Sequence, residues 1–277
     1  MDHGPPCIPP WPAGKFVIRF SHGTIEAVRP RIAIPVPHSG DPDYAGRALP
    51  QYERAVALAG GNPVRIPLDE KPAALVKRIE GCDGVLLPGS RADVDPAKYG
   101  TARDPKTADA DAKRDFVDEL LLEDAYRQRK PVLGICYGLQ ILNVYRKGSL
   151  VQHIESPINH EAGRKVAVAH TVAVALNSKL AQVVGETGAA LTQLSVNSSH
   201  HQSADMVGEG LTVGARCPED GIVEAIEGTS PDHFVLAVQW HPERSIDDDA
   251  ASRAIFSALV KAAQARHHEP VGESNAF

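Results

Sequence analysis

A short apolar run that breaks around a cysteine is the feature that most constrains the fold of this chain. The run covers residues 131–135, the break is the pentapeptide GICYG at residues 134–138, and helical spacing of apolar residues resumes from Leu139. An apolar run bounded by proline and glycine is typical of a buried strand. Glycines two residues before and after Cys136 leave room for the tight strand-to-helix turn called a nucleophile elbow. The pattern therefore predicts that Cys136 stands at the edge of a sheet.

The position of Cys136 favours a nucleophile, with a buried structural cysteine as the alternative. Because the thiol would face the positive end of a helix dipole, we expect its pKa to lie below the value of about 8.5 for free cysteine. A second apolar run, residues 234–240, ends in His241-Pro242-Glu243. Residues two apart on an extended chain point to the same side. His241 is thus a candidate base, and Glu243 would select its tautomer and stabilise the imidazolium.

Strand and helix patterns alternate before the cysteine, which is the rhythm of a parallel sheet. Strands are expected over residues 31–36, 64–67 and 83–87, and helices over residues 49–60, around 75–79 and over 113–129. The last of these helices has an apolar stripe of Phe116, Val117, Leu120, Leu121 and Tyr126. After the cysteine, consecutive antiparallel strands are expected over residues 165–174, 194–198, 211–215 and 222–226. A final helix is expected over residues 248–266.

These motifs together resemble the class I glutamine amidotransferase-like superfamily. Within it they resemble the free-standing branch called peptidase C26, which includes γ-glutamyl-γ-aminobutyrate hydrolase. The likeness runs from about Arg31 to Ala263 and rests on GICYGLQ at 134–140, QWHPE at 239–243, LPGS at 87–90, DPAKYG at 95–100, RD at 114–115 and VNSSHHQ at 196–202. It implies a flavodoxin-like, three-layer α/β sandwich with a mostly parallel central sheet and extra antiparallel strands.

The resemblance also implies roles for individual residues. The backbone N–H groups of Gly89 and Tyr137 would form the oxyanion hole, although a glycine at the end of a strand more often marks an ordinary turn. Weaker candidates for substrate binding are Gln140, Ser198, His200, His201, Arg114 and Asp115. Taken alone, charged residues such as the last two are more often solvated or capping residues in a first helical turn.

No metal site and no cofactor are expected. Adjacent histidines on a strand point to opposite sides, so His200 and His201 cannot easily bind one metal ion together. The sequence departs from the pattern of the branch at two places. Tyr137 stands where hydrolases of this branch commonly carry arginine, and residues 146–148 stand where paired glycines are common. The departures bear on substrate preference, because the backbone N–H of Tyr137 can still donate.

The reaction that the resemblance implies is hydrolysis of a small γ-glutamyl amide through a γ-glutamyl thioester on Cys136, with His241 and Glu243 completing the triad. One alternative is a glutaminase subunit that supplies ammonia to a separate synthase. Another is a catalytically silent member that acts as a binding or regulatory protein. A small-molecule substrate is expected in the first case, and a homodimer remains open.

Composition bounds the remaining possibilities. The formal net charge is −6 and the chain has no long basic run, which argues against nucleic acid as the main partner. Four widely spaced cysteines without a C-x-x-C pair, together with the lack of a membrane span or signal-peptide pattern, indicate a cytoplasmic protein. The expected organisation is a Pro-rich N-terminal extension over residues 1–30, the amidotransferase-like domain over 31–266 and a loose tail over 267–277.

Overall fold

The computed structural model describes residues 29–185 and 193–268. The expected Pro-rich extension therefore lies outside the described residues except for its last two positions, and so does the expected tail beyond His268. No helix in the described ranges combines the length and apolar character that a membrane crossing needs.

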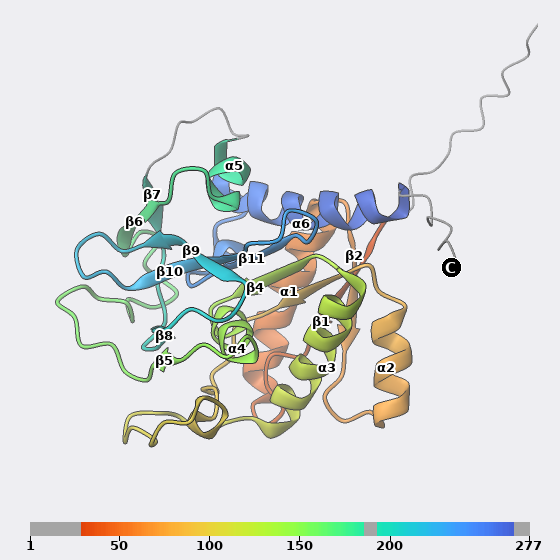
Figure 1. Cartoon of the computed structure of the whole chain (residues 1–277), viewed down its shortest axis with the longest axis horizontal. Coiled ribbons are helices and arrows are strands. Elements are labelled where there is room, and N and C mark those ends of the chain that lie inside the picture. Colours follow the sequence, from red (N-terminus) through yellow and green to blue (C-terminus); the bar gives the residue numbers. More distant parts are fainter. Residues whose placement is uncertain (1–28, 186–192, 269–277) are drawn as a thin grey trace, which may run out of the picture.

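A nine-stranded mixed sheet forms the centre of the described structure (Figure 1). Its order is β2-β1-β3-β4-β11-β10-β9-β6-β7. The first five strands in this order run parallel, and each pair from β11 onwards is antiparallel. The bounds are β1 Arg31–Pro35, β2 Asn62–Ile66, β3 Gly84–Leu87, β4 Val132–Ile135, β6 His170–Val174, β7 Gln193–Val196, β9 Leu211–Arg216, β10 Val223–Gly228 and β11 Val235–Val238.

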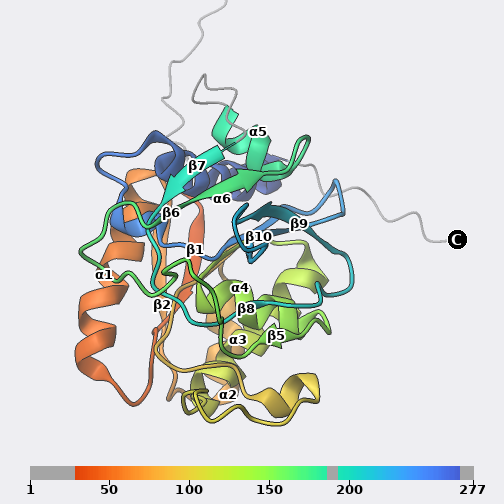
Figure 2. The same ribbon diagram turned by 90° about the vertical axis from the view of Figure 1, so that its left-hand side faces the viewer.

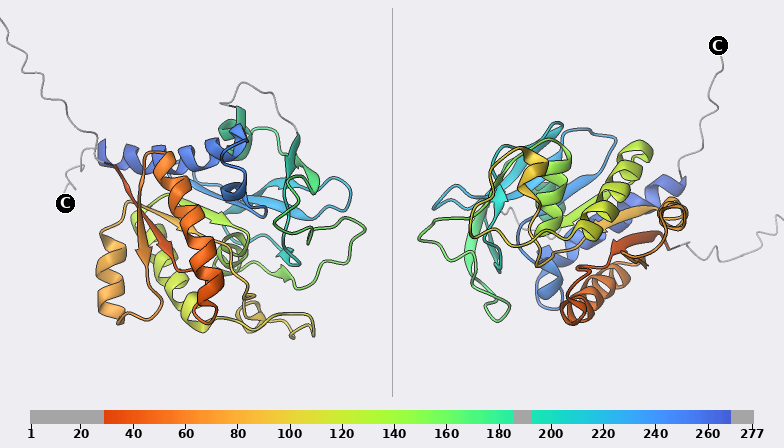
Figure 3. Two further views of the ribbon diagram at one scale, coloured as in Figure 1. Left: turned by 180° about the vertical axis from the view of Figure 1, so that it is seen from behind. Right: turned by 90° about the horizontal axis from the view of Figure 1, so that it is seen from below.

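Helices cover both faces of the sheet, as the view from below in Figure 3 shows. On one face lie α1 (Pro42–Leu58), α5 (Lys179–Gly185) and α6 (Ala250–His268). On the other lie α2 (Pro72–Glu80), α3 (Ala112–Gln128) and α4 (Tyr137–Tyr145). Every residue of β3, β4 and β11 is buried, as expected for strands covered on both faces. The fold is the expected α/β sandwich with a parallel centre and added antiparallel strands.

Short elements complete the chain. The strands β5 (Leu150–Val151) and β8 (Ser203–Ala204) pair with each other as a separate ribbon beside α4 (Figure 2). Two 3-10 turns, η1 (Pro96–Tyr99) and η2 (Pro242–Arg244), follow β3 and β11. The sequence patterns did not predict α5 or the β5–β8 ribbon.

Several predicted boundaries were wrong for physical reasons. A helix was expected from residue 49, whereas α1 begins at Pro42 because the Asp41 side chain accepts a hydrogen bond from the N–H of Tyr44 (2.8 Å). Only the second half of the strand expected over 165–174 forms, as β6. In α3 the expected stripe is partly wrong, because Phe116 is 43% exposed while Arg114 and Asp118 are buried.

Candidate active site

The predicted catalytic residues come together because three parallel strands end in register. Leu87 of β3 pairs with Gly134 of β4, which in turn pairs with Ala237 of β11. The N–H of Cys136 then donates to the carbonyl of Val238 (2.9 Å). Residues shortly beyond these positions meet at the carboxyl edge of the sheet, where α/β proteins place their ligands.

Cys136 occupies the sharp corner between β4 and α4. Its backbone has φ 54° and ψ −107°, a region that residues other than glycine rarely occupy. The flanking glycines permit the corner. A Cβ on Gly138 would lie 2.1 Å from the carbonyl oxygen of Leu87, and one on Gly134 would lie 2.7 Å from the carbonyl oxygen of Gly138. Only glycine fits at these two positions, so the predicted elbow is present.

His241 and Glu243 form a buried pair behind this corner. Nδ1 of His241 lies 2.8 Å from Oε1 of Glu243; because the carboxylate only accepts, Nδ1 carries the proton and Nε2 is free to act as a base. Asn197 holds the main chain of His241 from both sides. Its side-chain amide donates to the His241 carbonyl (2.9 Å) and accepts from the His241 N–H (3.1 Å).

The electrostatics of the pair favour a neutral imidazole beside an ionised carboxylate. Burial lowers the pKa of His241, with the charge of Glu243 opposing. Burial alone would raise the pKa of Glu243, but the neighbouring His241 and then Arg244 hold that pKa below its usual value. The imidazole is therefore in the form that can accept a proton at neutral pH.

The expectation of a lowered thiol pKa at Cys136 is contradicted. Burial raises the pKa of Cys136 to about 12, and the positive charge of Arg244 and the N–H of Tyr137 offset this only in part. The helix dipole acts on the thiol, but desolvation of the thiolate outweighs it. The resting site thus holds a protonated thiol beside a neutral imidazole.

Gly89 lies directly against Cys136 and His241. A Cβ at this position would lie 3.0 Å from Cε1 of His241 and 3.6 Å from Cβ of Cys136. Its N–H donates to the hydroxyl of Tyr52 (3.1 Å), and the carbonyl before it, that of Pro88, accepts from Nη2 of Arg114 (2.8 Å). Since a peptide unit is planar, holding the carbonyl also sets the direction of the N–H.

The structure places Arg114 and Asp115 in the interior, not at the mouth of a site. Arg114 is fully buried, contacts both carboxylate oxygens of Asp118 at 2.9 Å and lies over the ring of Tyr137. The Tyr137 hydroxyl donates to Asp115. Both charged side chains are therefore buried and not available to a substrate, because the start of α3 packs against the loop that precedes Gly89.

Most of the other weaker candidates for substrate binding also contact groups within the protein. The Gln140 amide donates to the carbonyl of Gln202, and the Ser198 hydroxyl donates to the carbonyl of His160. His200 is buried and faces Glu224. Only His201 is partly exposed, with Nε2 3.0 Å from Asp93, and this contact raises its pKa.

Three residues near the candidate catalytic side chains did not stand out as site residues in the sequence. Asn197 fixes the His241 backbone, Tyr52 receives the Gly89 N–H, and Arg244 donates to the hydroxyl of Ser199 (2.8 Å) beside Glu243. Asn197 lies in the motif at residues 196–202, so the sequence could have identified it. Tyr52 could not be identified from local sequence, because it reaches the site from α1 only through the tertiary fold. Among the described residues that could hold a metal ion, His160, His170, His200 and Glu224 form one buried group.

The chain matches a known protein family and is similar in sequence to several named proteins. The family model for peptidase C26 matches residues 36–243. A Mycobacterium tuberculosis protein named as a candidate glutamine amidotransferase is 38% identical over 225 residues, covering 79% of this chain and 68% of the relative. The γ-glutamyl-γ-aminobutyrate hydrolase of Escherichia coli O157:H7 is 35% identical over 229 residues, covering 79% of this chain and 86% of the relative.

Solved structures share the fold at low sequence identity. A Thermoplasma acidophilum protein described as a candidate component of GMP synthase has a TM-score of 0.60 at 16% identity, covering 86% of this chain and 96% of that one. The glutaminase domain of Trypanosoma brucei CTPS has a TM-score of 0.54 at 18% identity, covering 85% and 94%. Both are similar to this chain in fold, and these identities support no statement about activity.

Proposed function

Because the chain belongs to the peptidase C26 family, we propose that it is a hydrolase of small γ-glutamyl amides that uses Cys136 as its nucleophile. The observation that carries the proposal is the meeting of Cys136 with the paired His241 and Glu243 at the ends of β4 and β11. The 35% identity to a γ-glutamyl-γ-aminobutyrate hydrolase over most of both chains supports the substrate class.

The first half of the reaction forms a thioester. His241 Nε2 takes the proton of the Cys136 thiol as Sγ attacks the γ-carbonyl carbon, and Glu243 stabilises the resulting imidazolium. Charge on the carbonyl oxygen is stabilised by the N–H groups of Gly89 and Tyr137. To do so, the Gly89 N–H gives up its hydrogen bond to the Tyr52 hydroxyl and donates to the oxyanion instead. The C–N bond then breaks, and the imidazolium gives its proton to the departing amine.

The second half regenerates the thiol. Water replaces the amine, His241 Nε2 takes one of its protons, and the hydroxide equivalent attacks the thioester carbon. Sγ leaves with the proton from His241, and glutamate is released. No redox change occurs in either half, so the groups named here are sufficient for the chemistry.

Charged side chains near the thiol suit a γ-glutamyl group, which carries both an amine and a carboxylate. Asp93 and Arg244 both act electrostatically on the Cys136 thiol. Arg91 is 62% exposed, pairs with Asp41 (3.0 Å) and lies over the ring of Tyr44. We propose that Arg91 receives the α-carboxylate and Asp93 the α-amine of the substrate.

The second candidate function is a glutaminase subunit for a separate synthase, and the relative from M. tuberculosis favours it. A panel assay distinguishes the two. The isolated chain is incubated with γ-glutamyl-γ-aminobutyrate, other γ-glutamyl amides and glutamine, and glutamate release is followed by mass spectrometry. We expect faster release from the amides than from glutamine. Release from glutamine alone, and only with an added partner protein, would favour the glutaminase; silence on the whole panel would favour a binding protein.

A further inference from the structure

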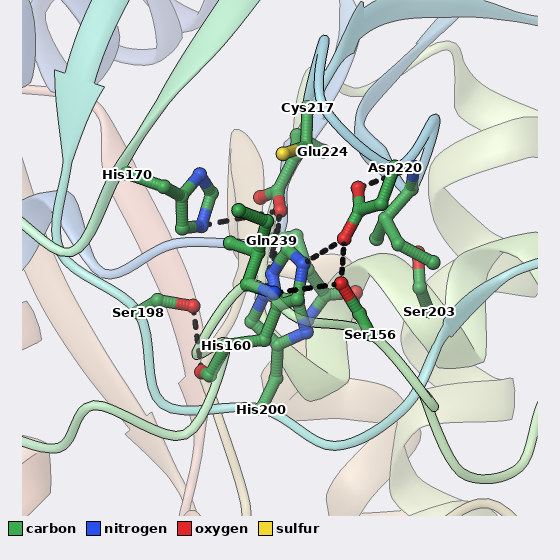
Figure 4. A network of polar contacts seen from close by, with 12 residues as sticks. Ser156, His160, His170, Ser198, His200, Ser203, Cys217, Asp220, Glu224 and Gln239 are labelled. Carbon is green, nitrogen blue, oxygen red and sulfur yellow. Dashed lines mark hydrogen bonds and ion pairs between the residues drawn. The ribbon is translucent and has the colours of Figure 1, made fainter.

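Three histidines and one glutamate form a buried cluster (Figure 4). His170 comes from β6, Glu224 from β10, His200 from the segment between β7 and β8, and His160 from the segment between β5 and β6. Each of the four is 7% exposed or less. Segments far apart in the sequence thus bring four potential metal ligands to one point.

The distances fit a single ion between these side chains. Oε1 of Glu224 lies 3.2 Å from Nδ1 of His160 and 3.5 Å from Nε2 of both His170 and His200. Four ligands at about 2.0–2.1 Å around a tetrahedral ion are separated by about 3.3–3.4 Å. The observed nitrogen–oxygen separations lie close to that value.

Each histidine of the cluster has one ring nitrogen that faces away from Glu224, and the contacts of these nitrogens show where the ring protons lie. Nε2 of His160 lies 2.8 Å from Oδ2 of Asp220, Nδ1 of His170 lies 3.2 Å from the carbonyl of Thr171, and Nδ1 of His200 lies 3.0 Å from the carbonyl of Gln202. A carbonyl or carboxylate oxygen can only accept, so each of these nitrogens is an N–H. In a neutral imidazole the other nitrogen is then a bare lone pair.

Those three lone pairs all face Glu224. Nδ1 of His160, Nε2 of His170, Nε2 of His200 and both carboxylate oxygens of Glu224 are buried and have no hydrogen-bond partner in the described part of the chain. Five acceptor atoms directed at one another without a donor are strongly unfavourable in a buried site. A divalent cation removes this conflict. The outward contacts to Asp220 and to the carbonyls are those that metal-bound histidines make to fix their orientation.

We propose that His160, His170, His200 and Glu224 bind one divalent transition-metal ion of the zinc class. Imidazole is a ligand for Zn²⁺, Fe²⁺ and Ni²⁺ rather than for Mg²⁺ or Ca²⁺, and a closed set of four protein ligands is typical of a structural zinc site. The ligand set revises our expectation of no metal. The argument about His200 and His201 holds, since His201 faces Asp93 instead, but His200 has other histidines beside it.

A pocket adjoins this cluster. It has a volume of ≈ 280 Å³ and is lined by His160 and His200 together with His201, Ser156 and the neighbouring loop. Two of the four ligand residues therefore line this pocket, although the Glu224 side chain itself is fully buried.

The site would be structural and would support the catalytic histidine. His200 follows Asn197 by three residues, and Asn197 holds the main chain of His241. An ion that ties this segment to β6 and β10 would fix the position of Asn197. The metal proposal does not depend on the substrate of the enzyme, because binding and stability can be measured without turnover.

The test is zinc binding by the full chain without an affinity tag. Wild-type protein is stripped with a chelator, dialysed against Zn²⁺ and analysed for bound metal, and its thermal unfolding is followed with and without Zn²⁺. We expect one equivalent of tightly bound zinc and a Tm that rises with the free zinc concentration. The variants Glu224→Gln and His170→Asn should lose that equivalent, and Asp220→Asn, which removes an outward contact, should bind zinc about 10–100-fold more weakly.

The matched control is His38→Asn, because the chain has 12 histidines and His38 lies outside the cluster, beside Asp111. It should keep both the zinc equivalent and the Tm shift. Should either cluster variant fail to fold, Co²⁺ bound to the wild type gives a second reading, since four-coordinate Co²⁺ has intense visible absorption. A wild type that binds no more zinc than Glu224→Gln, or whose Tm does not respond to zinc or chelator, would show that protons rather than a metal hold the cluster together.

Discussion

At the scale of single residues, the backbone of Cys136 is held in a conformation that its own side chain disfavours. Its φ is 54° and its ψ is −107°. For a residue that carries a Cβ, this backbone conformation is about 1–3 kcal/mol less favourable than one in a well-populated region. The fold retains this strain at a corner that places Cys136 beside Gly89, against which His241 also lies. The proposed function and stability therefore conflict at this position.

The conflict can be measured by comparing two substitutions that both remove the thiol. Cys136→Gly relieves the backbone strain, whereas Cys136→Ala keeps it. After the greater chain entropy of glycine in the unfolded state is subtracted, we expect the Gly variant to be about 1 kcal/mol more stable than the Ala variant in urea unfolding. Equal stabilities for the two variants after the same subtraction, or a less stable Gly variant after it, would show that the corner is not strained.

The protonation states of Cys136 and His241 lead to a pH prediction. The pKa of the Cys136 thiol is raised to about 12 and that of His241 is lowered, so thiol and imidazole are both uncharged at pH 7. Iodoacetamide reacts with the thiolate, and labelling of Cys136 should rise about tenfold per pH unit between about pH 6 and 9. Because the pKa of His241 is lowered, turnover should stay constant as the pH falls through the usual histidine range, and should decline only at a more acidic pH, where the imidazole takes up a proton. Rapid, pH-independent labelling down to about pH 5 would instead indicate a thiolate–imidazolium pair.

At the scale of elements, α3 connects the interior of the molecule to the loop at Pro88 and Gly89, which carries the proposed oxyanion donor. Arg114 joins Asp118 of the same helix to the carbonyls of Pro37 and Pro88, and both members of the ion pair are fully buried. The sequence pattern predicted α3 itself but not this role, because charged residues at a helix start are usually solvated. Burial of the pair depends on loops that arrive from β1 and β3, which no local pattern reports.

Breaking this ion pair should be costly. Arg114→Met leaves the carboxylate of Asp118 buried without its partner, and we expect a loss of about 3–5 kcal/mol in the free energy of unfolding. Arg54→Met is the matched control, since Arg54 pairs with Asp247 on the surface, with side chains 53% and 65% exposed; its unfolding midpoint should hardly change. If the two variants unfold at the same denaturant concentration, Arg114 does not contribute as described.

At the scale of the whole molecule, sequence patterns predict the parallel half of the sheet better than the rest. Fully apolar strands followed by glycine-bounded turns, as at residues 83–89 and 131–138, define β3, β4 and the edge where the site lies. The histidine cluster was not predicted, because its four members come from four separate segments and meet only in three dimensions. The raised thiol pKa was missed for the same reason, since burial is a property of the packed fold.

The expected domain division at residues 31–266, the cytoplasmic location and the homodimer remain predictions. The described structure does bring every proposed catalytic and oxyanion residue together within residues 89–243. We therefore expect the site to be assembled in the isolated chain, without a partner protein.

The central claim is that Cys136 carries a γ-glutamyl thioester during turnover. The direct test is to quench the wild-type chain with acid while it turns over γ-glutamyl-γ-aminobutyrate, and to map the peptides by mass spectrometry. We predict that the peptide containing Cys136 gains one γ-glutamyl group, that this group is lost to free glutamate when turnover continues, and that Cys136→Ala neither forms the adduct nor releases glutamate. Turnover by Cys136→Ala at the wild-type rate, or an adduct on another residue, would contradict the account.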